Sequence, residues 1–233
     1  MLWNIDLTLV DVAKVTRVAY AEAFRAITGR PLVHLPQMAG RSEPEIFFEA
    51  VALNGVSVSD AAASERLLAP FSAELATSLA ARRDLLTAQG QMMPGAAESL
   101  AALARLDGTV QSVLTGSSRP NATLKLRAFG LERHVDLSVG GFAGSEVYPK
   151  GTLLAVARQR AEDKYGVSFA ERATVYIADS PRDVEAARIG RARSVAVASG
   201  RASTTELRDS GADAVLPDLT DTARVVALVA EAS

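Results

Sequence analysis

Residues 1–11 of the chain read MLWNIDLTLVD, a short apolar run that delivers an amide, Asn4, and a carboxylate, Asp6, one residue apart. The apolar part, residues 2–5, has the composition of a buried β-strand, so the two polar side chains are expected at its carboxyl end. A pair of carboxylates that works in acid and base catalysis would need an acidic residue at both position 4 and position 6. The stretch therefore predicts a strand that leads into a polar site, with an amide in place of one of two acids.

Strands and helices alternate in the second half of the chain. Four short runs rich in apolar and β-branched residues read as strands, at 109–114, 173–178, 194–198 and 214–216. Helical periodicity follows each of them, most clearly over 119–129 and 181–189. Strands separated by helices of about 10–15 residues are typical of parallel βαβ units. We therefore predict an α/β fold with a doubly wound, Rossmann-like and mostly parallel sheet.

The segment between the first strand and the second lacks this alternation. Ala, Leu and Phe recur there at helical spacing, without a convincing strand, over 15–27, 43–53 and 60–87. Residues 90–95, GQMMPG, contain the turn-forming residues that would return the chain to the sheet. We expect an all-helical cap domain at 15–89, inserted into a core domain formed by 1–14 and 90–233.

Composition narrows the classes of function. The 233 residues carry a net charge of −2 and 48% hydrophobic residues, which suffices for a sizeable core and gives no general attraction to nucleic acid or anionic membrane. The absence of cysteine excludes disulfides, thiolate catalysis and zinc–thiolate sites. Because His34 and His134 are the only histidines, a histidine-rich metal site is not expected.

The N-terminal segment does not resemble a targeting signal, because it has no basic region and because Asn4 and Asp6 interrupt its apolar run. No run of about 18 apolar residues that could cross a membrane occurs. The sequence therefore predicts a cytoplasmic protein without a nucleic-acid or membrane partner. It leaves the oligomeric state open between a monomer and a homodimer.

Three polar residues, Asp6, Thr115 and Asp179, each come directly after a predicted strand. Ligands of open parallel sheets bind outside the carboxyl ends of the strands, so these side chains are expected to meet at one edge. Residues 115–118, TGSS, open a helix whose free N–H groups suit an anionic phosphate. The pattern favours a phosphate site at this edge.

Two carboxylates lie four residues apart across the start of a predicted helix, Asp179 and Asp183, with Ser180 in the N-cap position. Carboxylates so placed can hold Mg²⁺, which takes one or two of them and keeps its other positions for water and phosphate. Lys150 supplies a compact positive charge that could neutralise a phosphoryl group or bridge the acids.

Taken one at a time, these residues also fit simpler roles. Asp179 alone is more often a turn or capping residue, Thr115 a β-former and Lys150 a solvated surface residue. Residues 140–144 contain three glycines but open no helix, so they read as a plain loop rather than a phosphate loop. The order and location of the polar residues together favour the phosphate site.

Four motifs in order resemble the haloacid dehalogenase-like superfamily: NIDLTLVD at 4–11, LTGS at 114–117, YPK at 148–150 and IADSPRD at 177–183. The resemblance is strongest to the phosphoglycolate phosphatase and β-phosphoglucomutase branch, in which a helical cap follows the first strand. Residues 93–95, MPG, resemble that branch's return from the cap to the core. The resemblance covers nearly the whole chain and implies a phosphate-ester hydrolase with Mg²⁺ as its cofactor.

The resemblance also implies roles for individual residues. Asn4 stands at the position of the aspartate that attacks phosphorus and ligates Mg²⁺. Asp6 stands at that of the general acid and base, whose backbone carbonyl faces the metal. Asp179 and Asp183 match metal-binding positions. The residues implied to hold the phosphoryl group or the substrate are Thr115, Lys150, Thr8, Gly116 and Ser117.

Residues 40–42 of the expected cap, Gly-Arg-Ser, resemble a substrate-contacting loop of the family. This resemblance implies that Arg41 and Ser42 contact the substrate. The alternative is a solvated loop that precedes the helix at 43–53.

The chain departs from the family pattern in its first motif. Leu7 stands where the family often has glycine, and this position looks tolerant of change. Asn4 is the departure with a chemical consequence, because an amide has no anionic oxygen to attack phosphorus and cannot form an acyl phosphate. Its carbonyl oxygen nevertheless remains an adequate hard ligand for a metal.

Three functions are consistent with these residues. The first is a Mg²⁺-dependent phosphatase for a small phosphorylated metabolite, with weak or no activity because of Asn4. The second is a non-catalytic protein of the same fold that binds such a metabolite for regulation. The third is a phosphomutase or dehalogenase relative, which meets the same obstacle because both reactions need the first aspartate.

Overall fold

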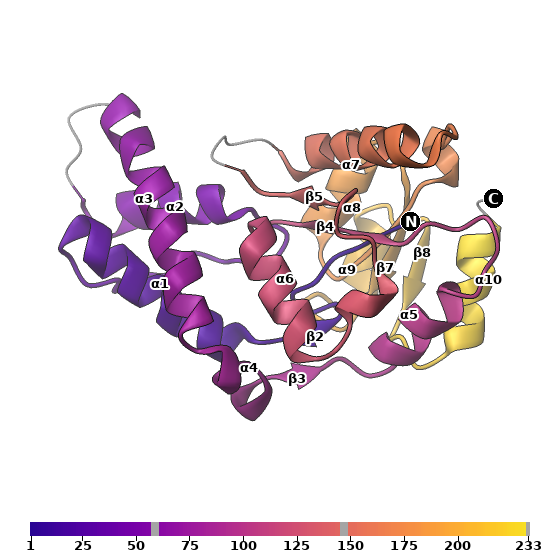
Figure 1. Ribbon diagram of the computed structural model, residues 1–233, viewed down its shortest axis with the longest axis horizontal. Coiled ribbons are helices and arrows are strands. Elements are labelled where there is room, and N and C mark those ends of the chain that lie inside the picture. Colours follow the sequence, from indigo (N-terminus) through magenta and orange to yellow (C-terminus); the bar gives the residue numbers. More distant parts are fainter. Residues whose placement is uncertain (57–60, 145–148, 232–233) are drawn as a thin grey trace.

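The structure, a computed structural model, describes residues 1–56, 61–144 and 149–231 (Figure 1). Asp60, the expected start of a helical stretch, and Tyr148, in the third motif, lie outside the described residues. At the centre is a six-stranded sheet in the order β5–β4–β1–β6–β7–β8, in which every neighbouring pair is parallel. The strands are β1 Leu2–Trp3, β4 Ser112–Thr115, β5 Gly141–Phe142, β6 Val175–Ala178, β7 Arg193–Val197 and β8 Ala214–Leu216.

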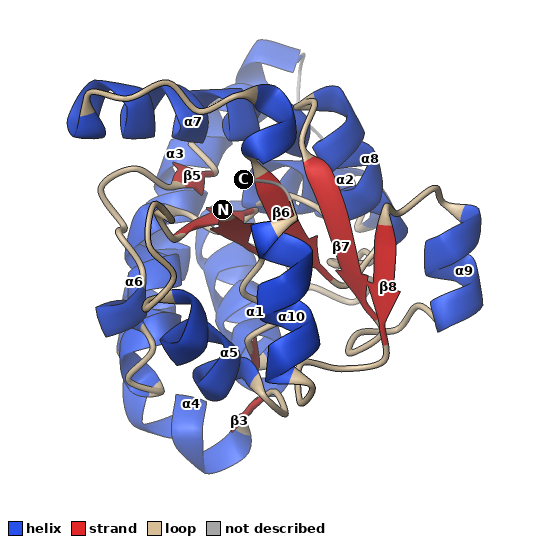
Figure 2. Cartoon of the chain, turned by 90° about the vertical axis from the view of Figure 1, so that its right-hand side faces the viewer, coloured by secondary structure: helices blue, strands red, loops and turns tan. Residues whose placement is uncertain are grey.

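Helices cover both faces of this sheet (Figure 2). They are α5 Ala96–Leu103, α6 Arg119–Ala128, α7 Lys150–Tyr165, α8 Pro181–Ile189, α9 Thr204–Asp209 and α10 Thr222–Ala230. Successive strand residues point to opposite faces, and the buried side chains divide accordingly. Leu2 and Tyr176 pack with α7 and α8, whereas Trp3 and Ile177 belong to the cluster that includes α5, α6 and α10. The predicted doubly wound α/β fold is confirmed.

Four helices lie between the first strand of the sheet and α5: α1 Ala13–Thr28, α2 Glu43–Leu53, α3 Ala61–Ala80 and α4 Arg83–Gln89 (left in Figure 1). A two-stranded antiparallel ribbon, β2 Val10–Asp11 with β3 Gln91–Met92, lies where the chain leaves the sheet and returns to it. Aromatic rings hold the helices together: the Phe71 ring stacks on Phe47 at 4.4 Å and lies 5.6 Å from Tyr20. The division into domains at 1–14 with 90–233 and at 15–89 remains a prediction.

The structure corrects two strand predictions around the site. The strand expected at 109–114 is Ser112–Thr115, so Thr115 ends the strand rather than following it. Residues 140–144 are not a plain loop, because Gly141–Phe142 pairs in parallel with β4 as an edge strand. Glycine is required there, since a Cβ on Gly141 would lie 2.7 Å from the Leu153 carbonyl oxygen of α7.

Several further boundaries differ from expectation, and for example β6 begins at Val175 rather than at residue 173. The first strand ends at Trp3 rather than at residue 5, and residues 91–92 form β3 instead of part of a turn. The single helical stretch expected to end at residue 87 is two helices, because α3 stops at Ala80 and α4 begins at Arg83.

Leu7 has a φ of 63°, in the left-handed region that disfavours branched side chains. This backbone conformation explains why a glycine suits that position.

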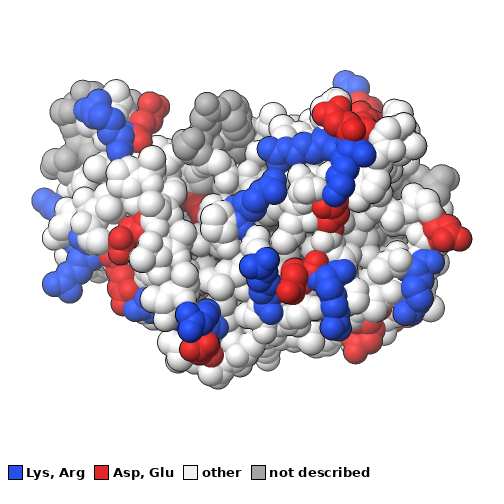
Figure 3. Space-filling view, viewed as in Figure 1, with Lys and Arg blue, Asp and Glu red and all other residues white. Residues whose placement is uncertain are grey.

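The surface carries charges of both signs. Most of the face shown in Figure 3 is uncharged, and basic and acidic side chains lie next to one another in several places. Some are paired, as in the 2.6 Å contact between Lys164 and Asp136. No helix within the described ranges has both the length and the apolar character that crossing a membrane requires.

Candidate functional site

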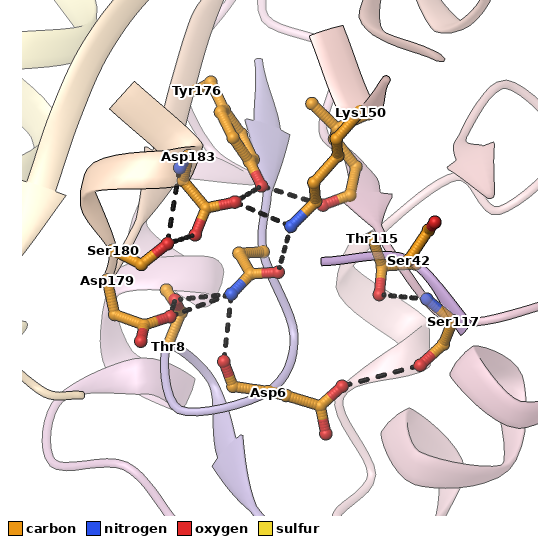
Figure 4. Close-up of polar contacts among 12 residues, drawn as sticks. Asp6, Thr8, Ser42, Thr115, Ser117, Lys150, Tyr176, Asp179, Ser180 and Asp183 are labelled. Atoms are coloured by element: carbon orange, nitrogen blue, oxygen red, sulfur yellow. Dashed lines mark hydrogen bonds and ion pairs between the residues drawn. The ribbon is translucent and has the colours of Figure 1, made fainter. Parts of the chain in front are cut away.

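Polar side chains gather where β1, β4 and β6 end and where α7 and α8 begin (Figure 4). Asn4 follows β1, Thr115 is the last residue of β4, and Asp179 follows β6. Lys150 is the first residue of α7, and Asp183 lies in the first turn of α8. The structure therefore brings predicted residues from three strands to one edge of the sheet.

Asn4 is buried at the centre of this group, with 5% of its surface exposed. Its Nδ2 donates to the Asp6 carbonyl at 2.9 Å, to Asp179 Oδ1 at 2.8 Å and to Thr8 Oγ1 at 3.2 Å. Its Oδ1 accepts from Lys150 Nζ at 3.0 Å. Because an ammonium group can only donate, this contact determines which end of the amide faces Lys150.

Lys150 is buried between Asn4 and Asp183, so its interpretation as a solvated surface residue is wrong. Its Nζ lies 2.6 Å from Asp183 Oδ1, which also accepts from the Tyr176 hydroxyl at 2.8 Å. Asp183 Oδ2 accepts from Ser180 Oγ at 2.5 Å, and Ser180 is the N-cap of α8 as predicted. Both oxygens of Asp183 are therefore occupied by donors of the chain itself.

Asp179 is buried against Asn4 and Thr8. Its Oδ1 accepts from Thr8 Oγ1 at 2.8 Å, and Thr8 is itself fully buried and does not line the cavity described below. Burial raises the pKa of Asp179 to about 7, and the Asp183 carboxylate adds to the increase. Gly200 lies directly against this carboxylate, since a Cβ there would overlap Oδ2. Sequence reasoning missed Gly200, because it follows β7 without any motif.

Asp6, the expected acid and base, forms an ion pair with Lys125 of α6. Lys125 Nζ lies 2.8 and 2.7 Å from the two carboxylate oxygens and donates to Ser117 Oγ at 3.0 Å. Lys125 is buried, and sequence analysis missed it. Its position in the predicted helix at 119–129 could have identified it. Lys125 lies one turn after Ala122 and beside Leu126, on the face of that helix that is buried.

Residues 40–42 are not a solvated loop, because they lie against the core at the mouth of the site. The Glu43 N–H donates to the Gly116 carbonyl at 2.7 Å, and a Cβ on Gly116 would overlap the Arg41 carbonyl. The Ser42 side chain forms a capping box with Glu45 at the start of α2. The Arg41 guanidinium pairs with Glu49. Gly116 therefore permits the close approach of this loop to the core.

A cavity of about 90 Å³ lies between this loop, α1 and the strand ends. Its core side is lined by Asn4, Asp6, Thr115, Gly116, Ser117, Lys125 and Lys150. On the α1 and α2 side are Thr16, Tyr20 and Glu43, all buried, and burial raises the pKa of Glu43. The hydroxyls of Thr16 and Tyr20 have no hydrogen-bond partner among the described residues. The cavity thus offers both charged and neutral polar groups to a small ligand.

A second and larger hollow of about 490 Å³ adjoins this cavity, and Leu7, Ala13, Met38 and Ala39 line both. Asp179 borders it, together with the three arginines Arg17, Arg182 and Arg201. Positive side chains at an approach to a site raise the local concentration of anions. This hollow is therefore suited to the approach of an anionic ligand.

The Mg²⁺ expected from the sequence would need several oxygen ligands at this edge. Asn4 instead points its N–H groups at the Asp6 carbonyl and at Asp179, and Asp183 is occupied by Lys150 and hydroxyl groups. Within the described ranges no group of three or more His, Cys, Asp or Glu residues is placed to hold a metal ion. The donor set in this arrangement does not fit Mg²⁺.

Solved structures with the same fold cover nearly the whole length of the chain. A hydrolase from Pseudomonas syringae is 23% identical, with a TM-score of 0.66, over 98% of this chain and 97% of that one. A predicted phosphoglycolate phosphatase from Haemophilus somnus is 17% identical, with a TM-score of 0.63, over 96% of each. A candidate β-phosphoglucomutase from Thermotoga maritima is 17% identical, with a TM-score of 0.57, over 98% of each. At these levels of sequence identity, the comparison shows that the folds are similar and shows nothing about function.

A search of curated proteins finds no match to the chain. The model of the haloacid dehalogenase-like hydrolase family matches residues 1–188, which include all four motifs and the polar site built on them. The resemblance seen in the sequence is therefore confirmed, and the chain belongs to the haloacid dehalogenase-like hydrolase family.

Proposed function

We propose that the protein binds the phosphoryl group of a small phosphorylated metabolite in the cavity at Asn4, Thr115, Ser117 and Lys150, and that Asn4 prevents efficient hydrolysis. The observation that carries this proposal is the position of the Asn4 amide. It lies buried at the centre of an otherwise complete polar site, where the family resemblance expects the nucleophilic carboxylate.

The charges around the cavity and the size of the cavity support a phosphorylated ligand. Lys150 and Lys125 place two ammonium groups beside the cavity, and α6 begins directly after Thr115–Ser117 with its N–H groups toward this edge. The arginines of the adjoining hollow add positive charge on the approach. A cavity of about 90 Å³ favours a metabolite of a few carbon atoms over a nucleotide or a polymer.

The chemistry of an amide explains the expected loss of turnover. A carboxylate at position 4 could attack phosphorus while the Asp6 carboxyl protonates the departing ester oxygen. The Asn4 amide has no anionic oxygen to form that bond, and its Oδ1 is already bound to Lys150. Phosphomutase and dehalogenase reactions need the same carboxylate, so the amide disfavours these alternatives equally. Binding without turnover agrees best with a regulatory or sensing role.

The test compares the chain with Asn4→Asp for hydrolysis of p-nitrophenyl phosphate with MgCl₂ present. We expect the aspartate variant to be faster by on the order of 10³-fold or more, because removal of a nucleophile has effects of this size. Gln91→Glu is the matched control, since it adds the same charge at an exposed position outside the site. Fast hydrolysis by the unchanged chain, with Asn4 shown intact by mass spectrometry, would contradict the proposal.

A further inference from the structure

Three oxygens at this edge already accept hydrogen bonds from one side chain. The Asp6 carbonyl, Asp179 Oδ1 and Thr8 Oγ1 all lie within 3.2 Å of one atom, Asn4 Nδ2. An amide NH₂ group carries two partly positive hydrogens, so it satisfies acceptors that a cation would otherwise neutralise.

We infer that the Asn4 amide takes the place of a divalent cation, so that the site excludes Mg²⁺ and binds its anionic ligand without one. This inference rests on the proposed function for the nature of the ligand. The exclusion of the cation follows separately from the contacts of Asn4.

The Asn4 side-chain amide cannot rotate by half a turn so that its oxygen takes the place of Nδ2. Rotation of the side-chain amide by half a turn would bring Nδ2 to within about 3 Å of Lys150 Nζ, placing two donors against each other. Lys150 is fixed in turn by its 2.6 Å contact with Asp183, which is buried. The orientation that points N–H groups at Asp179 is thus imposed by a buried ion pair.

Two of the three carboxylates that surround Asn4 already have an ammonium group as their partner. Lys125 is paired with Asp6, and Lys150 is paired with Asp183. Asp179 is the remaining carboxylate of the group, and its Oδ1 receives neutral donors from Asn4 and Thr8. A carboxylate at position 4 would lie about 2.8 Å from Asp179 Oδ1, and two such oxygens need a shared proton or a cation between them.

The experiment is isothermal titration calorimetry of MgCl₂ into the chain, Asn4→Asp and the control Gln91→Glu, each checked for folding by circular dichroism. We expect saturable Mg²⁺ binding by Asn4→Asp, and binding by the other two that is weaker by about tenfold or more, or undetectable. Binding of Mg²⁺ to the unchanged chain as tightly as to Asn4→Asp overturns the inference. Failure of a folded Asn4→Asp to bind Mg²⁺ also overturns it, because Asn4 would then not be the excluding residue.

A second titration, of inorganic phosphate into the unchanged chain in EDTA or in MgCl₂, does not depend on any variant. Equal dissociation constants in the two buffers support the inference, and binding that requires Mg²⁺ overturns it while the proposed function stands. If phosphate binds in neither buffer, the proposed function fails. The exclusion of Mg²⁺ is then judged by the first titration alone.

Discussion

Lys125 and Asp6 are unequal partners in their ion pair. The Lys125 side chain is 3% exposed, whereas that of Asp6 is 41% exposed, and one more acceptor, Ser117 Oγ, faces the ammonium group. A charge that loses its partner in a buried position costs far more free energy than one that can turn to water. The contribution of this pair to stability therefore depends on which partner is removed.

We predict that Asp6→Ala lowers the free energy of unfolding by about 3 kcal/mol, because the buried Lys125 ammonium then keeps only Ser117 as a hydrogen-bond partner among the described residues. Lys125→Met leaves a hydrated carboxylate and is expected to cost about 1 kcal/mol or less. Urea unfolding of both variants measures the difference. The double variant Asp6→Ala/Lys125→Met is the control, and it should recover most of the loss. Equal costs for the two single changes would contradict this description of the pair.

The sequence predicted those site residues that follow strands. Asn4, Thr115 and Asp179 could be placed together because the carboxyl ends of parallel strands share one edge. Lys125 and Gly200 could not, since neither belongs to a motif. Lys125 acquires its role from the buried face of a helix, and Gly200 from contact with a carboxylate distant in the chain.

At the scale of elements, α2 begins with a capping box that uses Ser42, one of the two cap residues expected to contact substrate. Ser42 donates from its hydroxyl to Glu45 Oε2 at 2.8 Å and accepts from the Glu45 N–H at 3.4 Å. The same arrangement occurs at the start of α9, between Ser203 and Glu206, away from the 90 Å³ cavity although Glu206 borders the adjoining hollow. Ser203 is exposed and Ser42 is buried, so the second box is a reference for the loss of a cap alone.

We predict that Ser42→Ala lowers the free energy of unfolding by about 1 kcal/mol, as Ser203→Ala does, because each removes one cap. The phosphate dissociation constant of Ser42→Ala should stay unchanged, since the Ser42 hydroxyl is committed to Glu45. Urea unfolding and phosphate titration calorimetry give the two values. A tenfold or greater loss of phosphate affinity in Ser42→Ala alone would show that the hydroxyl contacts the ligand, as the family resemblance implied (about 1.4 kcal/mol).

Elements were predictable from the sequence where a periodic pattern was long enough. The helices at Glu43–Leu53 and Pro181–Ile189 were predicted with their observed ends. The two-residue strands Gly141–Phe142 and Gln91–Met92 were not, because two residues show no alternation. Their strand structure arises from pairing with partners elsewhere in the chain.

At the scale of the whole molecule, one buried cluster runs through the sheet and the helical segment. It joins Trp3 of β1 and Leu100 of α5 to Tyr20 of α1 and Phe71 of α3. The Glu43 N–H, at the start of α2, adds a polar contact between the two regions by donating to the Gly116 carbonyl. Cooperative unfolding depends on such continuity, since regions that share a core lose it together.

We predict that the chain unfolds in a single calorimetric transition whose van't Hoff and calorimetric enthalpies agree, although the sequence divides it into a core and a cap. Phosphate at about 100 times its dissociation constant should stabilise the native state by about 2.7 kcal/mol and raise Tm by roughly 5–10 °C. Sodium chloride at equal ionic strength is the control and should not reproduce this shift. Two separated transitions, with only one of them moved by phosphate, would show instead that 15–89 unfolds independently and that the ligand is held by the core alone.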